Sequence, residues 1–380
     1  MEEYVNSVAE NQSPQNGGNE SKKDKRKLTK REKGKIALIV VGSFFGLIAL
    51  LVVILAPIIA VGNKAIVRDT VEPNQMLTQW MSYISDDTPI TDMAIPGSHD
   101  SGCYDMPWYA ETQDLTFAEQ LARGVRYFDI RVNNSRDGYV VFHGPVNGVE
   151  YEDLLRDIDE FMDANPTEFL ILDFSHFKND SESKVFEMFD EIVGAARLVN
   201  DSELSDEEFL DSLTLGDVRG KCIVFVDPDE TSFRDRPYLF LRANDKSEYP
   251  CASLTSPYKK LWNGSSAKKF AGEILDRYFD EFSKYDSGFF VLQCQLTDNA
   301  LVFGPRYREG KLIDLANDYI ADLYSDTAKL PYVNIIMRDF VTCEKTALVI
   351  RLNEAKGYVA EEHRAEFVAA MNGFACMERV

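Results

Sequence analysis

The sequence predicts an α/β fold, a closed (β/α) barrel of the TIM type that follows a single transmembrane helix near the N-terminus. Eight short apolar runs alternate with helix-like stretches, and strands separated by helices are typical of parallel βαβ units. About 290 residues follow Thr88, which is close to the size of one barrel domain. An uncharged run of 27 residues, from Ile36 to Gly62, precedes them. A doubly wound parallel sheet is the alternative architecture.

The uncharged run is long enough for one transmembrane helix, since a bilayer core of about 30 Å needs about 20 apolar residues. A buried core helix would normally show a polar stripe. A cleaved signal peptide is a further alternative, because residues 56–65 include small side chains, but its apolar region usually spans only about 7–15 residues. Nine Lys or Arg and two acidic residues lie between Ser21 and Lys35, a local charge of +7. The positive-inside rule therefore predicts a single-pass plasma-membrane protein with a cytoplasmic N-terminus and an extracellular C-terminal domain.

The overall charge narrows the class of protein. The 380 residues include 63 Asp and Glu against 41 Lys and Arg, a net charge of −22, and 45% are hydrophobic. This composition excludes a disordered chain and a polytopic membrane protein, and the acidic balance disfavours nucleic acid as a partner. The predicted segments are a cytoplasmic tail with a basic collar (1–35), the transmembrane helix (36–62), a stalk and lead-in (63–87) and the barrel (88–380).

The candidate strands are short runs of apolar residues, bounded by turn residues. They span Thr91–Ile95, Arg126–Val132, Tyr139–Phe142, Phe169–Phe174, Cys222–Val226, Tyr238–Leu241, Phe289–Leu296 and Asn334–Met337. Two helices between them are indicated by apolar residues at helical spacing, which are Leu154, Leu155, Ile158, Phe161 and Met162, and then Val185, Phe186, Phe189, Ile192 and Val193. Cys222 and Cys294 lie inside apolar runs, which favours buried free thiols over disulfides.

Three of the four histidines, His99, His143 and His176, fall at or just beyond the C-terminal end of a predicted strand. In a parallel barrel these ends open on one face, where catalytic groups lie. A single histidine at a strand end is more often structural than catalytic. Three at one rim indicate a functional site.

Charged side chains accompany these histidines. Asp100 follows His99, and Asp129 and Arg131 share one face of the second strand because side chains alternate along a strand. Asp339 ends the last strand, which neighbours the first in a closed barrel. Closure would bring this carboxylate to His99, where it could fix the tautomer of the imidazole. A structural ion pair at the barrel end is the alternative for Asp339.

Two histidines and an arginine suit the cleavage of a phosphodiester. One imidazole can remove a proton from an attacking hydroxyl, the second can protonate the leaving oxygen, and the guanidinium can bind the phosphoryl oxygens. A glycosidase would instead need a pair of carboxylates. The sequence contains no Gly-rich phosphate loop, GxSxG elbow or HExxH motif, so nucleotide-binding, serine-hydrolase and zinc-protease functions have no support.

Several motifs together resemble a known family, the X domain of phosphatidylinositol-specific phospholipase C. The matching segments occur in order, and their spacing fits a barrel. They are AIPGSHDS (94–101), QLARGVRYFDIRV (120–132), VFHG (141–144), FLILDFSHF (169–177), LGDVRGKCIVF (215–225) and IMRDFV (336–341). The resemblance implies a distorted, incompletely closed TIM barrel.

The resemblance also implies roles for individual residues. His99 would be the general base on the inositol 2-hydroxyl, oriented by Asp339, and His143 would be the general acid for the diacylglycerol oxygen, supported by Asp100. Arg131 would stabilise the phosphate charge. The sequence is similar to the metal-independent bacterial type, in which the arginine stands in place of a metal ion. We therefore expect no metal and no cofactor.

The residues of the head-group pocket depart from the family pattern. Bacterial members that hold inositol use a lysine and an arginine at the ends of the fourth and fifth strands, where this sequence has Ser175, His176 and Asp227. His176, Asp227 and also Asp173 are the candidates for contacts with the substrate, and burial at the barrel end is the alternative for the two carboxylates.

The loop after the first strand holds an apolar cluster that includes Trp108 and Tyr109. Family members insert aromatic side chains of the rim into the lipid, so this cluster is expected to contact the membrane, with core packing as the alternative. A phospholipid, phosphatidylinositol or a glycosylated relative, and the bilayer are the expected partners. The alternative functions are a glycerophosphodiesterase on a related barrel and a surface module that binds lipid or glycan without catalysis.

Overall fold

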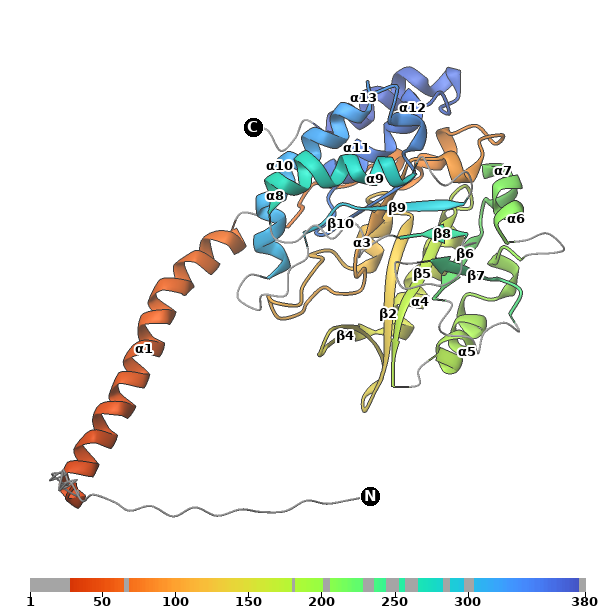
Figure 1. Cartoon of the computed structure of the whole chain (residues 1–380). Helices are drawn as coiled ribbons and strands as arrows, with labels where there is room; N and C mark the ends of the chain where they lie inside the picture. Colours follow the sequence, from red (N-terminus) through yellow and green to blue (C-terminus); the bar gives the residue numbers. More distant parts are fainter. Residues whose placement is uncertain are drawn as a thin grey trace, which may run out of the picture. The chain divides into compact units, whose positions relative to one another are not determined.

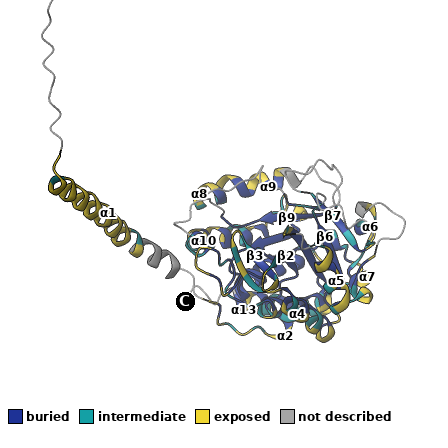
Figure 2. Ribbon diagram, turned by 90° about the horizontal axis from the view of Figure 1, so that it is seen from below, coloured by how far each residue is buried: buried dark blue, intermediate teal, exposed yellow. Residues whose placement is uncertain are grey.

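The computed structural model describes residues 28–64, 68–179, 182–200, 206–227, 236–243, 253–256, 266–282, 288–296 and 304–375. The chain divides into two compact units, Met1–Ala56 and Pro57–Val380. Helix α1 (Lys30–Lys64) is long and apolar enough to cross a membrane, and no other helix among the described residues is. Its large apolar side chains between Ile36 and Ile54 are exposed, and this part of the helix is drawn in yellow in Figure 2.

The second unit is a closed barrel of eight parallel strands (Figure 1). Its strand order is β1-β10-β9-β8-β7-β6-β5-β2, and a direct pairing of β1 with β2 completes the ring. The strands are β1 (Ile95–Ser98), β2 (Tyr127–Ser135), β5 (Leu170–Lys178), β6 (Cys222–Val226), β7 (Leu239–Ala243), β8 (Leu254–Thr255), β9 (Phe289–Gln293) and β10 (Ile335–Arg338). The predicted (β/α) barrel is confirmed.

The ring is closed where the family resemblance led us to expect an incomplete barrel. Gly97 and Ser98 of β1 pair with Tyr127 and Phe128 of β2. A Cβ atom on Gly97 would lie 2.7 Å from the Tyr127 ring, so glycine is needed where these two strands meet. The weakest links are the pairings of β8, which has only two residues in register with each neighbour.

The prediction of eight strands was right in number but wrong in one member. The segment Tyr139–Phe142 is not a barrel strand. It belongs to β3 (Gly138–His143), which pairs antiparallel with β2 and then with β4 (Val146–Glu150). Only two residues separate the paired Ser135 and Gly138, and a connection that short permits only an antiparallel hairpin. The barrel strand that the sequence analysis missed is β8, which is too short to show an apolar run.

The first strand also begins later than predicted. Residues Ile90–Asp92 form a 3-10 turn, and β1 starts at Ile95. The helices that surround the barrel and complete the unit are α2 (Gln75–Thr78), α3 (Phe117–Ala122), α4 (Tyr151–Ala164), α5 (Glu182–Ile192), α6 (Asp206–Ser212), α7 (Leu215–Val218), α8 (Ala267–Lys269), α9 (Leu275–Phe282), α10 (Pro305–Leu323), α11 (Cys343–Ile350), α12 (Leu352–Ala355) and α13 (Arg364–Ala375). The two amphipathic helices predicted from apolar spacing are α4 and α5.

The core has an inner layer inside the barrel and outer layers between strands and helices (Figure 2). The inner layer continues into Met76, Leu77, Trp80 and Met81, which are buried although they fall in the predicted stalk and lead-in. The indole nitrogen of Trp80 donates to the carbonyl of Gly124 at 3.0 Å. This part of the lead-in is therefore packed as part of the barrel unit.

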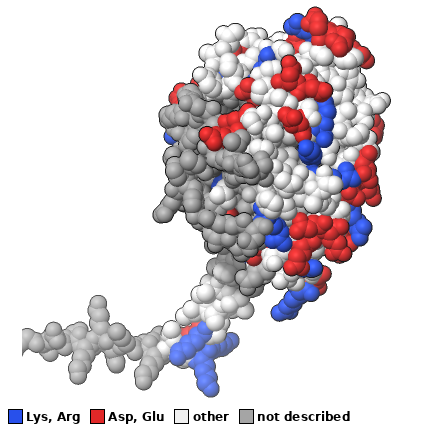
Figure 3. Space-filling view, turned by 90° about the vertical axis from the view of Figure 1, so that its right-hand side faces the viewer, with Lys and Arg blue, Asp and Glu red and all other residues white. Residues whose placement is uncertain are grey.

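The surface of the barrel unit carries acidic clusters with basic side chains among them (Figure 3). Cys222 and Cys294 are buried and free, as predicted, and so are Cys103 and Cys343. The candidate residues for catalysis lie at one end of the barrel, where the strand ends carry histidines.

Candidate active site

His99 directly follows β1 and meets Asp339, which directly follows the neighbouring strand β10. The Nδ1 atom of His99 lies 2.7 Å from Asp339 Oδ1, as closure of the barrel predicts. Burial opposes protonation of His99, but the charges of Asp100 and Asp339 outweigh it and raise its pKa to about 9. Burial raises the pKa of Asp339, although the nearby imidazolium offsets this effect. An acceptor at Nδ1 leaves Nε2 as the nitrogen that exchanges protons.

Arg131, on β2, binds two buried carboxylates. Its Nε atom is 2.6 Å from Asp100 Oδ1, and its Nη2 atom is 3.0 Å from Asp129 Oδ2. Burial opposes ionisation of Asp129, but the charge of Arg131 more than offsets it and holds the pKa of this carboxyl below its ordinary value. The Nη2 atom also lies 3.3 Å from His99 Nε2. The guanidinium is therefore fixed beside the proposed base with part of its surface open to solvent.

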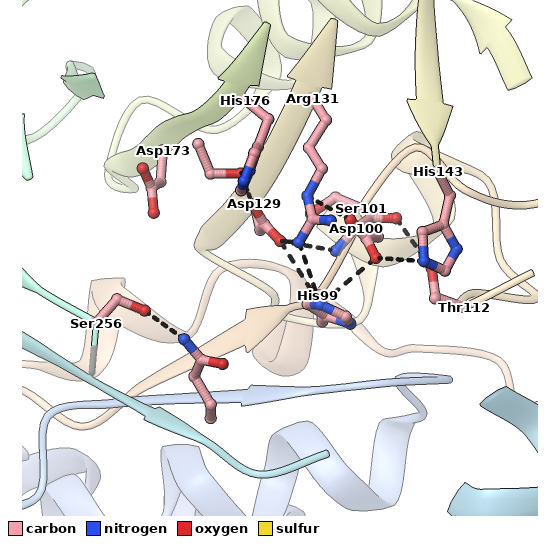
Figure 4. Close-up of polar contacts among 12 residues, drawn as sticks. His99, Asp100, Ser101, Thr112, Asp129, Arg131, His143, Asp173, His176 and Ser256 are labelled. Carbon is pink, nitrogen blue, oxygen red and sulfur yellow. Dashed lines mark hydrogen bonds and ion pairs between the residues drawn. The ribbon is translucent and has the colours of Figure 1, made fainter. Parts of the chain in front are cut away.

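The hairpin of β2 and β3 brings His143 back to the same rim. Because Val132 pairs with Val141, the end of β3 returns to the level at which β2 leaves the barrel. There His143 Nε2 lies 3.7 Å from Asp100 Oδ2, the oxygen that is 3.4 Å from His99 Nε2. One carboxylate thus stands between the two imidazoles (Figure 4).

Backbone conformation helps to aim these carboxylates. Asp100 has φ +44°, and Phe340, the residue after Asp339, has φ +46°. Non-glycine residues seldom adopt this left-handed region, and such residues cluster at functional sites. Both turns occur directly after a barrel strand, where they redirect the chain across the rim.

A bulge between β2 and β5 shapes the neighbouring wall. Ile130 pairs with Phe174 and Arg131 with His176, so Ser175 is the extra residue. Its hydroxyl donates to Asp129 Oδ1. His176 Nδ1 lies 3.1 Å from the same hydroxyl. Partial burial and the positive charge of Arg131 lower the pKa of His176 to about 4, so the imidazole is neutral at pH 7.

Asp173 is buried inside the barrel end, which is the alternative that the sequence analysis left open. Its side chain is fully buried, its Oδ2 accepts from the Tyr127 hydroxyl at 2.6 Å, and its Oδ1 is 2.8 Å from Arg242 Nε. Burial raises its pKa to about 6, against the lowering effect of Arg242. Asp227 is partly exposed and lies 3.9 Å from Arg242 Nη1. Asp173 therefore supports the pocket wall, while Asp227 reaches toward solvent.

The structure thus brings together His99, Asp100, Arg131, His143 and Asp339, with His176 and Asp227 beside them and Asp173 beneath. Three further residues lie at this site, although the sequence analysis gave them no role: Asp129, Ser175 and Arg242. Arg242 could have been found, because it takes an inward position on β7 by alternation with Leu241 and Ala243. Elsewhere in the barrel, Gln293 on β9 donates to the Ser256 hydroxyl at 2.7 Å.

Among the described residues, His99, Asp100 and Asp129 form a cluster whose ligand atoms lie within 4.8 Å of one another. The two carboxylates could hold a cation only after losing Arg131, since the guanidinium already contacts both. A fixed arginine in this position does not fit a divalent metal ion at the same carboxylates.

The loop that carries Trp108 and Tyr109 splits into a buried and an exposed part. Tyr104 and Met106 pack into the core, whereas Trp108 and Tyr109 are 38% and 42% exposed. Their rings lie edge to face with centroids 5.6 Å apart. This pair is an exposed aromatic tip on the loop next to His99.

Comparisons with known proteins show what this chain is similar to. Residues 87–227 match the family model described as "Phosphatidylinositol-specific phospholipase C, X domain". A 1-phosphatidylinositol phosphodiesterase of Listeria monocytogenes is 27% identical over 288 residues, which cover 73% of this chain and 85% of that protein. A protein of the same name from Staphylococcus aureus is 31% identical over 209 residues, which cover 52% of this chain and 65% of that protein, just under two thirds.

A comparison with solved structures finds a similar barrel fold. The solved structure of the Listeria monocytogenes phosphatidylinositol-specific phospholipase C superposes with a TM-score of 0.59 at 23% identity, over 73% of this chain and 98% of that one. At that identity the likeness shows the barrel fold alone, and the family assignment rests on the sequence matches. The chain thus carries a match to the X domain of phosphatidylinositol-specific phospholipase C over residues 87–227 and is an enzyme of that type.

Proposed function

We propose that this enzyme is a membrane-anchored, extracytoplasmic phosphodiesterase that cleaves phosphatidylinositol or a glycosylated relative into diacylglycerol and a cyclic inositol phosphate. The observation that carries the proposal is the placement of two imidazole Nε2 atoms, of His99 and His143, 3.4 and 3.7 Å from Asp100 Oδ2. Arg131 holds the other oxygen of that carboxylate at 2.6 Å. A base, an acid and a fixed cation at one point are what intramolecular phosphoryl transfer requires.

In the first step, His99 Nε2 takes the proton of the inositol 2-hydroxyl, whose oxygen then attacks phosphorus. Asp339 on Nδ1 fixes the tautomer and stabilises the imidazolium that forms. The pKa of about 9 reflects this stabilisation. The neighbouring carboxylates therefore make His99 a stronger base than an ordinary histidine, and its neutral form, which is the minor form below pH 9, is the one that can take the proton.

As the new oxygen–phosphorus bond forms, the bond from phosphorus to the diacylglycerol oxygen breaks. Protonated His143 supplies the proton from Nε2 to this oxygen, which would otherwise leave as a poorly stable alkoxide. Asp100, between the imidazoles, favours the charged form of whichever histidine holds the proton. His99 ends protonated and His143 neutral, so proton and charge balance.

Arg131 would neutralise the negative charge that gathers on the non-bridging phosphoryl oxygens. Its binding by Asp100 and Asp129 orients the guanidinium before substrate arrives, so little reorganisation is needed during the reaction. This arrangement supports a mechanism in which the arginine acts where other family members use a metal ion.

The head group would meet the wall formed by β5, β6 and β7. Neutral His176 and the carboxylate of Asp227 can bind hydroxyl groups, and Arg242 with Asp173 holds this wall in place. Such a wall suits a polyhydroxylated ring. The exposed pair of Trp108 and Tyr109 would enter the lipid interface, where amphipathic aromatic rings are favoured.

Anchoring would come from the helix of the predicted transmembrane segment 36–62, with residues 1–35 in the cytoplasm. The length, apolar surface and basic start of α1 support this arrangement. Residues 63–87 and 88–380 would then form the lead-in and the barrel outside the cell, at a plasma membrane.

The test is product analysis by phosphorus NMR with the full chain and phosphatidylinositol in mixed micelles. We expect a cyclic phosphate and diacylglycerol in the presence of EDTA, and we expect His143→Ala to lower the rate by about 100-fold or more. His363→Ala is the matched control, because His363 packs edge to face on Tyr83 outside the site. Full activity of His143→Ala would refute the mechanism, loss of activity with EDTA would refute metal independence, and binding without turnover would favour a lipid-binding module.

A further inference from the structure

The loop between β1 and α3, residues 103–114 (the rim loop), contacts both proposed catalytic histidines. The backbone carbonyl of Ala110 lies 2.7 Å from His143 Nδ1. A carbonyl oxygen can only accept a hydrogen bond, so Nδ1 must carry a proton whenever this contact is made. The proton that His143 exchanges is thereby assigned to Nε2, the atom that faces Asp100.

The same loop ties together the ends of the strands that carry His99 and Asp339. The side-chain amide of Gln113 donates to the carbonyls of His99, at 2.8 Å, and of Arg338, at 3.1 Å. Its oxygen accepts from the backbone of Val341 at 3.0 Å. Gln113 is fully buried, so the position of the rim loop and that of the base are linked.

Arg306, in the first turn of α10, holds the rim loop from outside. Its Nη1 donates to Asp114 at 2.8 Å and its Nη2 to Glu111 at 2.8 Å, and the Nη2 also contacts Asp114. The guanidinium carbon lies 4.6 Å from the centre of the Phe340 ring, next to Asp339. One arginine thus spans the rim loop and the end of β10.

Arg306 is connected to His143 through a single peptide group, the one that joins Ala110 and Glu111. The carbonyl of Ala110 and the N–H of Glu111 belong to the same planar unit. That N–H donates to Pro107 at 3.1 Å, the carbonyl accepts from His143, and the Glu111 side chain is bound by Arg306. A shift of the Glu111 backbone would therefore also move the carbonyl that accepts from His143 Nδ1.

We propose that Arg306 is a positioning residue for His143, which fixes the tautomer of the acid by holding the rim loop. This inference rests on the proposed role of His143 as general acid. The bidentate fork of arginine matters, because a lysine would supply the charge but not the geometry that grips two carboxylates.

The experiment compares Arg306→Gln and Arg306→Lys with wild type in the full chain, on two substrates. Cleavage of phosphatidylinositol expels the diacylglycerol oxygen, a poor leaving group that needs protonation by the acid, whereas an inositol 4-nitrophenyl phosphate has an activated leaving group that needs it little. We expect Arg306→Gln to lower kcat on the lipid by about 10- to 100-fold and on the nitrophenyl ester by about 3-fold or less. Arg306→Lys should lie between, and Arg197→Gln, a control arginine that contacts Asp159 and Asp163, should match wild type.

Nitrogen NMR of histidine-labelled protein reads the tautomer directly and independently of activity. Neutral His143 should be protonated at Nδ1 in wild type and a mixture of tautomers in Arg306→Gln. An unchanged tautomer in Arg306→Gln, with either an equal loss on both substrates or no loss, would overturn the proposal. If His143 becomes a mixture of tautomers in Arg306→Gln while lipid cleavage stays normal, His143 is not the general acid. The effect of Arg306 on the tautomer of His143 would still stand.

Gly304 provides a second route if Arg306→Gln fails to fold. A Cβ atom at this position would lie 2.2 Å from the Trp108 carbonyl oxygen. Gly304→Ala therefore displaces the rim loop without removing a charge. It should cause the same selective loss on the lipid substrate, and unchanged kinetics on both substrates would contradict the proposal.

Discussion

The raised pKa of His99 makes a quantitative prediction about stability. A pKa of about 9 in the folded protein against about 6.5 in an unfolded chain corresponds to about 3 kcal/mol. The folded state holds the proton more tightly, so this stabilisation is fully present below pH 6.5. It declines as pH rises and is lost above about pH 9.

The assay is urea unfolding of wild type and His99→Gln between pH 6.5 and 9.5, followed by tryptophan fluorescence. The difference in unfolding free energy between the two proteins should shrink by about 3 kcal/mol over this range. Taking the difference removes other groups that titrate here, such as Lys356, whose pKa is lowered to about 8 chiefly by burial. Histidine NMR should give a midpoint near pH 9 for His99, and Asp339→Asn should lower it.

Two results would refute this reasoning. The first is a midpoint for His99 at or below pH 7, which would mean that burial outweighs the two carboxylates. The second is a free-energy difference that does not change with pH. Either would also remove the argument that the neighbouring carboxylates make His99 a stronger base than an ordinary histidine.

Three further predictions concern other parts of the molecule. Arg131→Lys should lower kcat by about 10- to 100-fold, since it loses the fork that spans Asp100 and Asp129, and calcium should not restore the rate in a steady-state assay. The double variant Trp108→Ala, Tyr109→Ala should weaken sedimentation with phosphatidylinositol vesicles while activity on a water-soluble inositol ester stays within about 2-fold, and loss on both substrates would contradict a membrane-contact role. Trp80→Ala should cost about 3–5 kcal/mol of unfolding free energy, and a cost below 1 kcal/mol in urea titration would show that the lead-in is not part of the core.

The sequence predicted the rim histidines well because strand ends in a barrel converge whatever the lengths of the connections. Closure alone places Asp339 beside His99. His143 reached the rim for a different reason from the one assumed: it ends a hairpin strand that doubles back along β2, not a barrel strand. Both routes bring the side chain to one rim, so its position was predicted although the topology was wrong at that strand, and its catalytic role stays a prediction.

The parts that sequence could not supply are those made by backbone groups and by register. The acceptor for His143 is the carbonyl of Ala110, and a backbone carbonyl leaves no trace in residue type. The bulge that turns Ser175 toward Asp129 depends on register between β2 and β5. The two-residue strand β8 is defined by its neighbours and not by its own pattern.

The two imidazoles are held alike at Nδ1 but by groups of different charge, and this difference separates the roles proposed for them. A carboxylate, Asp339, holds His99, and a neutral carbonyl, that of Ala110, holds His143. Both Nε2 atoms face Asp100 at similar distances, so the shared carboxylate does not distinguish them. The buried charge of Asp339 does, because it favours the protonated form of His99 alone. In the proposed mechanism, the histidine with a full charge on its far side is therefore the base, and the one fixed by a neutral dipole is the one that gives its proton to the leaving oxygen.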